Sequence, residues 1–119
     1  MKIQLAYKFT GENESETKKL LEEISNILKE KGHEVYCPVL NPNRPIEKKD
    51  LFFDALKRIE GADALLVLVK SKEKSEGMLM EIGHALANGT KLILVINNNI
   101  KNTHLRDCLL YTSDAADEL

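Results

Sequence analysis

A single carboxylate stands in the most apolar helix that the sequence predicts. The segment 75–87 follows the apolar run 64–69, and from Met78 onward its only ionisable residues are Glu81 and His84. A helix that is apolar on nearly every side is normally buried, and an unpaired carboxylate is costly to bury. We therefore expect Glu81 to act chemically, as a nucleophile. The alternative is a carboxylate at the helix edge that reaches solvent.

The start of this helix has the composition of an anion site. Ser75 lies six positions before Glu81, where its hydroxyl would cap the helix and the N–H groups of the first turn would remain free to bind an anion. Gly77 would let the backbone approach a ligand closely. Both residues also have an ordinary interpretation, since serine is a common helix cap and a glycine is tolerated in a first turn.

Strand-like and helix-like segments alternate along the chain. We expect strands at 2–7, 34–39, 64–69 and 92–96, and helices from Asn13 to Gly32, from 46 or 50 to 60, and from 75 to 88. Such alternation is typical of a parallel sheet covered by helices on both faces. The predicted fold is a three-layer α/β/α domain, flavodoxin-like or Rossmann-like. Its expected strand order is 2-1-3-4, with a possible fifth strand missing.

The predicted topology places the candidate residues near one crevice. In such folds, ligands bind beyond the carboxyl ends of the strands. The segments that follow the four expected strands are 7–10, 38–43, 70–77 and 97–104. Glu81 lies about one and a half turns into the helix that borders this crevice.

Composition and charge exclude several classes of protein. The 119 residues are 43% hydrophobic and 30% charged, with a formal net charge of -2. This balance offers no basic field for nucleic acid or a membrane surface, and no apolar run is long enough to span a membrane. Cys37 and Cys108 match no metal-binding spacing and no disulfide framework. We expect one cytoplasmic domain that binds no metal, no nucleic acid and no membrane.

The segment 108–119 is expected to lie outside the domain. It resembles a translated sequencing adapter, so the domain is predicted to span residues 1–107 and the natural chain to continue differently. The alternative is a genuine acidic tail.

Several motifs together resemble one enzyme family. They are the opening strand KIQLA, the segment GHEVYCP, the step Ala62-Asp63 into an apolar strand, and the pattern Ser-x-Gly-x-x-x-Glu-Ile-Gly-x-Ala that begins at Ser75. Over residues 2–107 the chain resembles the nucleoside 2-deoxyribosyltransferase-like family, which includes 2′-deoxynucleoside 5′-phosphate N-hydrolases.

The resemblance implies a glycosidic displacement. Glu81 would attack C1′ of a deoxyribosyl group and form a covalent ester, after which water would give hydrolysis and a second base would give base transfer. The partner would be a small 2′-deoxynucleoside or its 5′-monophosphate, with no cofactor and no metal. In the hydrolase branch a serine at the position of Ser75 contacts the 5′-phosphate, whereas the transferase branch tends to carry aspartate. Ser75 therefore favours a nucleotide substrate.

The chain departs from the family pattern at three places. Gln4 replaces a tyrosine that orients the nucleophile, and it could hydrogen-bond Glu81 or be an ordinary polar residue of the strand. Tyr7 stands where small residues commonly line the phosphate pocket, so it would crowd or reshape that pocket. A family aspartate is replaced by Ala55. Asp54, one position earlier, could serve after a small shift of its helix, or it is simply solvated.

The resemblance also implies a homodimer or a higher homo-oligomer. In the family, a neighbouring subunit completes the active site from the loop after the fourth strand. Here that loop contains Asn102, Thr103 and His104, of which Thr103 or His104 could reach across a dimer; the alternative is an ordinary surface loop. The apolar helix would be buried at such an interface. His84 is either a proton donor or a histidine satisfied at this interface.

Other classes of function fit the residues less well. A flavin-binding electron carrier is disfavoured, because Glu12, Glu14 and Glu16 would repel a phosphate and no Trp is present to stack on a flavin. A phospho-receiver would need an acidic pair after the first strand and an aspartate ending the third, and both are missing. The remaining alternative to an enzyme is a nucleotide-binding or sensing protein of the same fold that has lost turnover.

Overall fold

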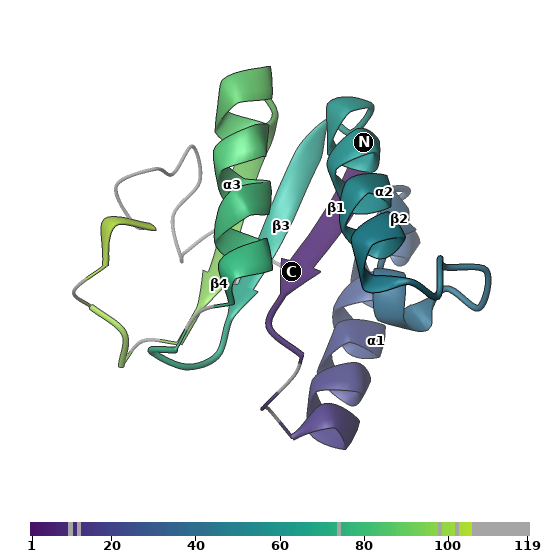
Figure 1. Ribbon diagram of the computed structural model, residues 1–119. Coiled ribbons are helices and arrows are strands. Elements are labelled where there is room, and N and C mark those ends of the chain that lie inside the picture. Colours follow the sequence, from purple (N-terminus) through teal and green to yellow (C-terminus); the bar gives the residue numbers. More distant parts are fainter. Residues whose placement is uncertain (10, 12, 74, 98, 102, 106–119) are drawn as a thin grey trace.

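The structure, a computed structural model, describes residues 1–9, 11, 13–73, 75–97, 99–101 and 103–105. Its elements follow in the order β1 (Lys2–Tyr7), α1 (Glu14–Glu30), β2 (Glu34–Tyr36), the short 3-10 helix η1 (Pro38–Leu40), α2 (Lys48–Glu60), β3 (Ala64–Val69), α3 (Glu76–Asn88) and β4 (Lys91–Ile96) (Figure 1). The predicted domain boundary after residue 107 and the segment 108–119 lie outside the described residues. No helix in the described part of the chain is both long and apolar enough to cross a membrane.

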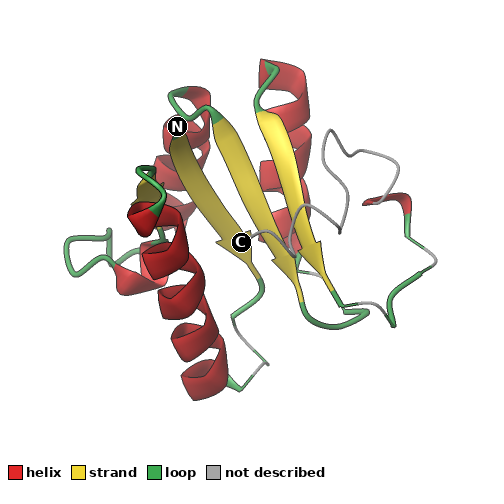
Figure 2. Ribbon diagram, turned by 180° about the vertical axis from the view of Figure 1, so that it is seen from behind, coloured by secondary structure: helices red, strands yellow, loops and turns green. Residues whose placement is uncertain are grey.

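The strands form one parallel sheet between two layers of helices. The strand order is β2-β1-β3-β4, as predicted. Helices α2 and α3 cover one face of the sheet, and α1 covers the other face (Figure 1 and Figure 2). The three-layer α/β/α prediction is therefore confirmed. Because all strands run the same way, their carboxyl ends meet at one edge of the sheet.

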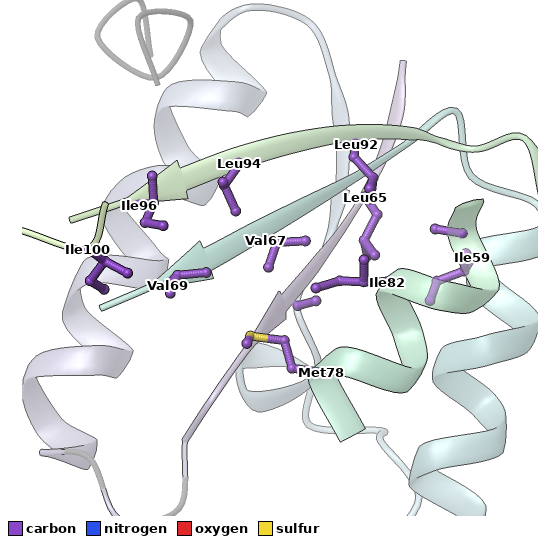
Figure 3. Close-up of a cluster of buried hydrophobic side chains, with 12 residues drawn as sticks. Ile59, Leu65, Val67, Val69, Met78, Ile82, Leu92, Leu94, Ile96 and Ile100 are labelled. Carbon is purple, nitrogen blue, oxygen red and sulfur yellow. The ribbon is translucent and has the colours of Figure 1, made fainter. Parts of the chain in front are cut away.

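Strand β3 is the centre of both hydrophobic cores. None of its six residues exposes more than 5% of its surface, and alternate side chains point to opposite faces. The core under α2 and α3 includes Ile59, Leu65, Val67, Met78 and Ile82 (Figure 3). The core under α1 includes Leu21, Ile24, Leu28, Leu66 and Leu68. These contacts hold α3 firmly on the sheet.

The second strand is shorter than predicted. We expected a strand over 34–39, but β2 ends at Tyr36 and η1 begins at Pro38. Proline has no N–H to donate to a neighbouring strand, and its fixed φ suits the first position of a helix. The N–H of Val39 donates to the hydroxyl of Tyr7 at 2.8 Å instead. The segment after β2 is thereby drawn towards the end of β1.

Within a single chain the apolar helix α3 is buried on one side only, and its expected burial at an interface between subunits stays a prediction. Three residues of α3 pack against the rest of the protein: Met78, Ile82 and Ala85. Three others expose 43%, 57% and 47% of their surface: Leu79, Met80 and Leu86. A helix in an outer layer can bury only one side against its own sheet. Its apolar outer side has no cover within the described chain.

Asp63 connects the starts of three strands. Its Oδ2 accepts the N–H of Lys2 at 2.7 Å, and its own N–H donates to the carbonyl of Lys2 at 2.8 Å. Its carbonyl accepts the N–H of Lys91 at 3.3 Å. These bonds link β1, β3 and β4 at the amino edge of the sheet. The carboxylate of Asp63 is therefore structural and lies at the opposite edge from the strand ends.

We expect Asp63→Ala to lower the free energy of unfolding by about 1 kcal/mol, because it removes a charge-assisted hydrogen bond at an exposed position. Urea unfolding followed by circular dichroism measures the change. Glu23→Ala, at an exposed position of α1, is the control and should change the stability by less than about 0.5 kcal/mol. An Asp63→Ala variant as stable as the wild type would contradict the structural role.

Candidate active site

A cavity of about 440 Å³ opens at the carboxyl edge of the sheet. It is bounded by the end of β1 and the two residues after it, by the start of η1, by the first two turns of α2, and by the N-terminal half of α3. This is the edge where the sequence predicts a ligand crevice. Of the candidate site residues proposed from the sequence, four line it, namely Tyr7, Ser75, Gly77 and Glu81, as does Ala55 at the position of the family aspartate.

Glu81 is the one acidic side chain among the described residues that line this cavity. It lies beside Ile82 at the border of the packed side of α3, and it is mostly buried. No described residue forms a hydrogen bond or an ion pair with its carboxylate. Burial raises the pKa of Glu81 from 4.5 to about 7. Near neutral pH the carboxyl group therefore exchanges readily between its two protonation states.

Ser75 caps α3 as predicted. Its Oγ accepts the N–H of Met78 at 3.0 Å, and its carbonyl accepts the N–H of Leu79 at 3.1 Å. The remaining N–H groups of the first turn have no carbonyl partner inside the helix. At Gly77, a Cβ atom would meet nothing within 4 Å, so the absence of a side chain leaves this part of the cavity open. The part of the cavity wall formed by Ser75 and Gly77 thus lies at the positive end of a helix dipole.

Tyr7 forms the wall at the end of β1. Its hydroxyl accepts the N–H of Val39, and its ring meets the edge of Phe9 with the ring centroids 6.4 Å apart. Burial, and secondarily the nearby Cys37 thiol, raise the pKa of the Tyr7 hydroxyl. The phenol is therefore neutral, and it is a fixed part of the wall.

The extent of the wall formed by α2 could not be recognised from the sequence, which pointed to this helix only through the position of Ala55. Lys48, Leu51, Phe52 and Ala55 line the cavity, and their spacing of three and four positions places them on one face of the helix. The same spacing is typical of a stripe that packs into a core, and it does not distinguish a core from a cavity. Leu51 and Phe52 are only partly buried, because the cavity takes the place of packed neighbours.

The cations of the cavity are a second feature that the sequence does not single out. Lys8 follows β1 directly, and Lys48 is the first residue of α2. Lysines in loops and at helix starts are normally solvated surface residues. Only the folded chain brings these two together with Glu81 around one space.

Gln4 and Asp54 do not line the cavity. Gln4 exposes 1% of its surface, and its Nε2 has no hydrogen-bond partner within the described residues. It borders a different hollow of about 360 Å³. Asp54 accepts a hydrogen bond from Nε of Arg58 at 2.8 Å and one from the hydroxyl of Tyr36 at 3.4 Å. Its carboxylate is therefore held outside the cavity.

The loop after β4 and His84 also lie away from the cavity within one chain. Oγ1 of Thr103 accepts the N–H of Leu105 at 3.2 Å, and His104 is exposed; neither lines the cavity. Asn102 lies outside the described residues. Nε2 of His84 lies 3.2 Å from Oε1 of Glu60 at the end of α2, so this imidazole faces away from Glu81's cavity.

The arrangement combines a mostly buried carboxylate, aromatic walls and two lysines, Lys8 and Lys48, in the cavity lining. A carboxylate in poorly hydrated surroundings stabilises a developing positive charge well, since little water competes with it. The described residues contain no group of three or more His, Cys, Asp or Glu side chains arranged to hold a metal ion. The geometry suits a ligand with a neutral ring beside Glu81 and a polar or anionic group towards the start of α3.

Comparison by sequence identifies a family. The family described as nucleoside 2-deoxyribosyltransferase matches residues 6–116 of this chain. A comparison with curated proteins finds no match.

Solved structures with the same fold are similar over most of the chain. A 2-deoxyribosyltransferase from Bacillus psychrosaccharolyticus is 22% identical with a TM-score of 0.78, and the match covers 100% of this chain and 92% of that one. The CMP N-glycosidase BcmB from Clostridium botulinum is 25% identical with a TM-score of 0.62, over 95% and 84% of the two chains. A 2-deoxyribosyltransferase from Leishmania mexicana is 20% identical with a TM-score of 0.66, over 82% and 65%.

We expect Glu81→Gln to be more stable than the wild type at and above about pH 7. The pKa of about 7 in the folded protein exceeds the ordinary value of 4.5, so ionisation of Glu81 opposes folding. This penalty is absent below about pH 4.5, grows as the pH rises to about 7, and is then constant at no more than about 3 kcal/mol. Thermal unfolding across this pH range measures the difference.

The control for this experiment is Glu76→Gln, an exposed position in the first turn of the same helix. It should show no gain in stability that develops between about pH 4.5 and 7. Unfolding temperatures of Glu81→Gln that run parallel to those of the wild type over the whole range would contradict the burial of an ionisable Glu81.

Proposed function

Because the chain belongs to the nucleoside 2-deoxyribosyltransferase family, we propose that it cleaves the N-glycosidic bond of a 2′-deoxynucleoside or of its 5′-monophosphate, with Glu81 as the nucleophile. One observation carries this proposal. The cavity at the carboxyl edge of the sheet is lined by a single acidic side chain among the described residues, and that side chain is Glu81.

In the first step, an Oε atom of Glu81 attacks C1′ of the sugar. The C1′–N bond breaks, its electron pair leaves with the base, and the base takes a proton from solvent. The transition state has the character of an oxocarbenium ion, which the nearby carboxylate stabilises before it forms the ester bond. Only the ionised carboxylate can attack, so this step requires a pH near or above the pKa of about 7.

In the second step, an acceptor attacks C1′ and gives up a proton to solvent, while the ester C1′–O bond breaks and its electron pair restores the carboxylate of Glu81. Water as the acceptor gives the free sugar or sugar phosphate, and this is hydrolysis. A second base as the acceptor gives a new nucleoside, and this is base transfer. The two reactions share the same intermediate and differ only in what reaches C1′.

The walls of the cavity support this class of substrate. The rings of Tyr7, Phe9 and Phe52 offer apolar faces against which a base can pack. The start of α3, with Ser75 as its cap, offers N–H groups to the 5′ end of the sugar. The C. botulinum relative is a glycosidase of CMP, a nucleoside monophosphate, and this favours including phosphorylated substrates in the proposal.

We also propose that the working unit is a homodimer or a larger homo-oligomer. The exposed apolar side chains Leu79, Met80 and Leu86 lie on the outer side of α3, the helix that carries Glu81. A second copy that covers this side would bury them and bring its own Thr103 and His104 near the cavity of the first. Neither of these residues lines the cavity within one chain.

We expect Glu81→Ala to abolish release of the free base, with a loss of at least about 10³-fold, because no other carboxylate of the described residues lines the cavity to replace the nucleophile. Chromatography of deoxynucleosides and deoxynucleoside 5′-monophosphates, with and without an acceptor base, measures the reaction. The wild-type rate should rise with pH up to about 7 and then level off. Glu76→Ala on the same helix is the control and should keep its activity.

The substrate panel separates the alternatives. Base release without an acceptor identifies a hydrolase, and base exchange that needs an acceptor identifies a transferase. If the protein binds nucleotides without turnover, and Glu81→Gln leaves this binding unchanged, the protein is a nucleotide-binding or sensing protein and not an enzyme.

We expect Met80→Glu to convert the wild-type oligomer to a monomer, since it places a charge in the apolar side of α3. Size-exclusion chromatography with light scattering measures the mass. Ile46→Glu is the matched control, because Ile46 is 98% exposed before α2 and should tolerate the same change. A wild-type protein that is monomeric at high concentration would rule out the oligomer.

A further inference from the structure

The ion pair between Lys8 and Glu73 joins two loops at the carboxyl edge of the sheet. Nζ of Lys8 lies 3.2 Å from Oε2 of Glu73. Lys8 follows β1, whereas Glu73 lies between β3 and α3, two positions before Ser75. The pair therefore connects the end of β1 with the segment that leads into the helix carrying Glu81.

The two partners differ in their surroundings. The side chain of Lys8 is only 20% exposed and lines the cavity, whereas the side chain of Glu73 is 86% exposed and does not line it. The ammonium group of Lys8 is therefore part of the cavity wall, whereas the carboxylate of Glu73 that pairs with it lies mostly in solvent. An ion pair with such an exposed partner contributes little to stability, because water screens it. A stronger anion can displace Glu73 at little cost.

Among the residues described, the cavity lining holds one acid, Glu81, while Glu76 in the first turn of α3 is exposed and lies outside the lining. Ser75 and Gly77 at the start of α3 line the same cavity as Lys8, and the first turn of a helix attracts anions. Lys48 adds a second positive charge on the α2 side. The carboxylate of Glu81 in this lining is the group assigned to the sugar.

We infer that Lys8 binds the 5′-phosphate of the substrate, that Glu73 holds this ammonium group until the phosphate replaces it, and that the protein therefore selects nucleoside 5′-monophosphates over nucleosides. A phosphate carries up to two negative charges and three acceptor oxygens, so it pairs with an ammonium group more strongly than a single exposed carboxylate does. A nucleoside, which has only a 5′-hydroxyl, cannot displace Glu73. This inference rests on the proposed function, since it assigns the other end of the same substrate.

The test is the affinity of four 2′-deoxynucleoside 5′-monophosphates and of the four corresponding deoxynucleosides, measured by isothermal titration calorimetry on the full chain. Lys8→Met should weaken monophosphate binding by about 10-fold or more, the value of one charge-assisted contact. Glu73→Gln should strengthen it by about 3-fold, because the competing anion is removed. Glu73→Gln, outside the cavity lining, should bind the nucleosides as the wild type does, and Lys8→Met should weaken nucleoside binding far less than monophosphate binding. Lys31→Met and Glu30→Gln, both exposed on or next to α1, match the changes in net charge and should have no effect.

The opposite effects of the two variants are the decisive result. If the ion pair only stabilised the loops, Lys8→Met and Glu73→Gln would weaken binding alike and would affect nucleosides as well as monophosphates. Either that pattern or a failure of all four monophosphates to bind the wild type would overturn the inference. Thermal unfolding of each variant excludes a loss of folding as the cause.

Failure of this inference is distinguishable from failure of the proposed function. Base release that depends on Glu81 but is equally fast with nucleosides and monophosphates would retain the enzyme and reject the role of Lys8. Binding of monophosphates that depends on Lys8, without any base release, would retain the phosphate site and reject the nucleophile.

Discussion

The parallel pairing of β1 with β3 is the constraint on which the rest of this structure depends. The register runs from Ile3 opposite Ala64 to Tyr7 opposite Leu68, and β3 is buried on both faces. A slip of one residue would turn every side chain of β3 to the wrong core. Since the pairing is fixed, the chain leaves both strands at the same edge. The loops that carry Lys8 and Ser75 must therefore lie close together.

Much of this arrangement can be predicted from the sequence, because its signals are local. The alternation of strands and helices gives the layers, and the apolar run of β3 marks a strand buried on both faces. Ser75 can be identified as a helix cap from its place before an apolar helix. Glu81 stands out because a charge in such a helix is unfavourable. These signals need no knowledge of which distant segments meet.

The features that escaped prediction depend on contacts between distant segments. Asp54 and Ala55 are neighbours in sequence, but they point about 100° apart around α2, and Arg58 and Tyr36 hold the carboxylate of Asp54 away from the cavity. The apolar side chains along one face of α2 can pack in a core or line a cavity, depending on which residues lie opposite them. The sequence indicated an apolar helix that fits an interface, but it could not show which side of α3 its own sheet would leave exposed.

The early end of β2 has a consequence for aggregation. Edge strands expose unpaired N–H and C=O groups, to which a strand of another molecule can add. In the described sheet, the β2 edge is only three residues long and is followed closely by Pro38, which has no N–H to offer. Extension of the sheet from molecule to molecule through this edge is therefore disfavoured. Of the two edge strands of the described sheet, β2 therefore favours strand addition less than β4, which is six residues long.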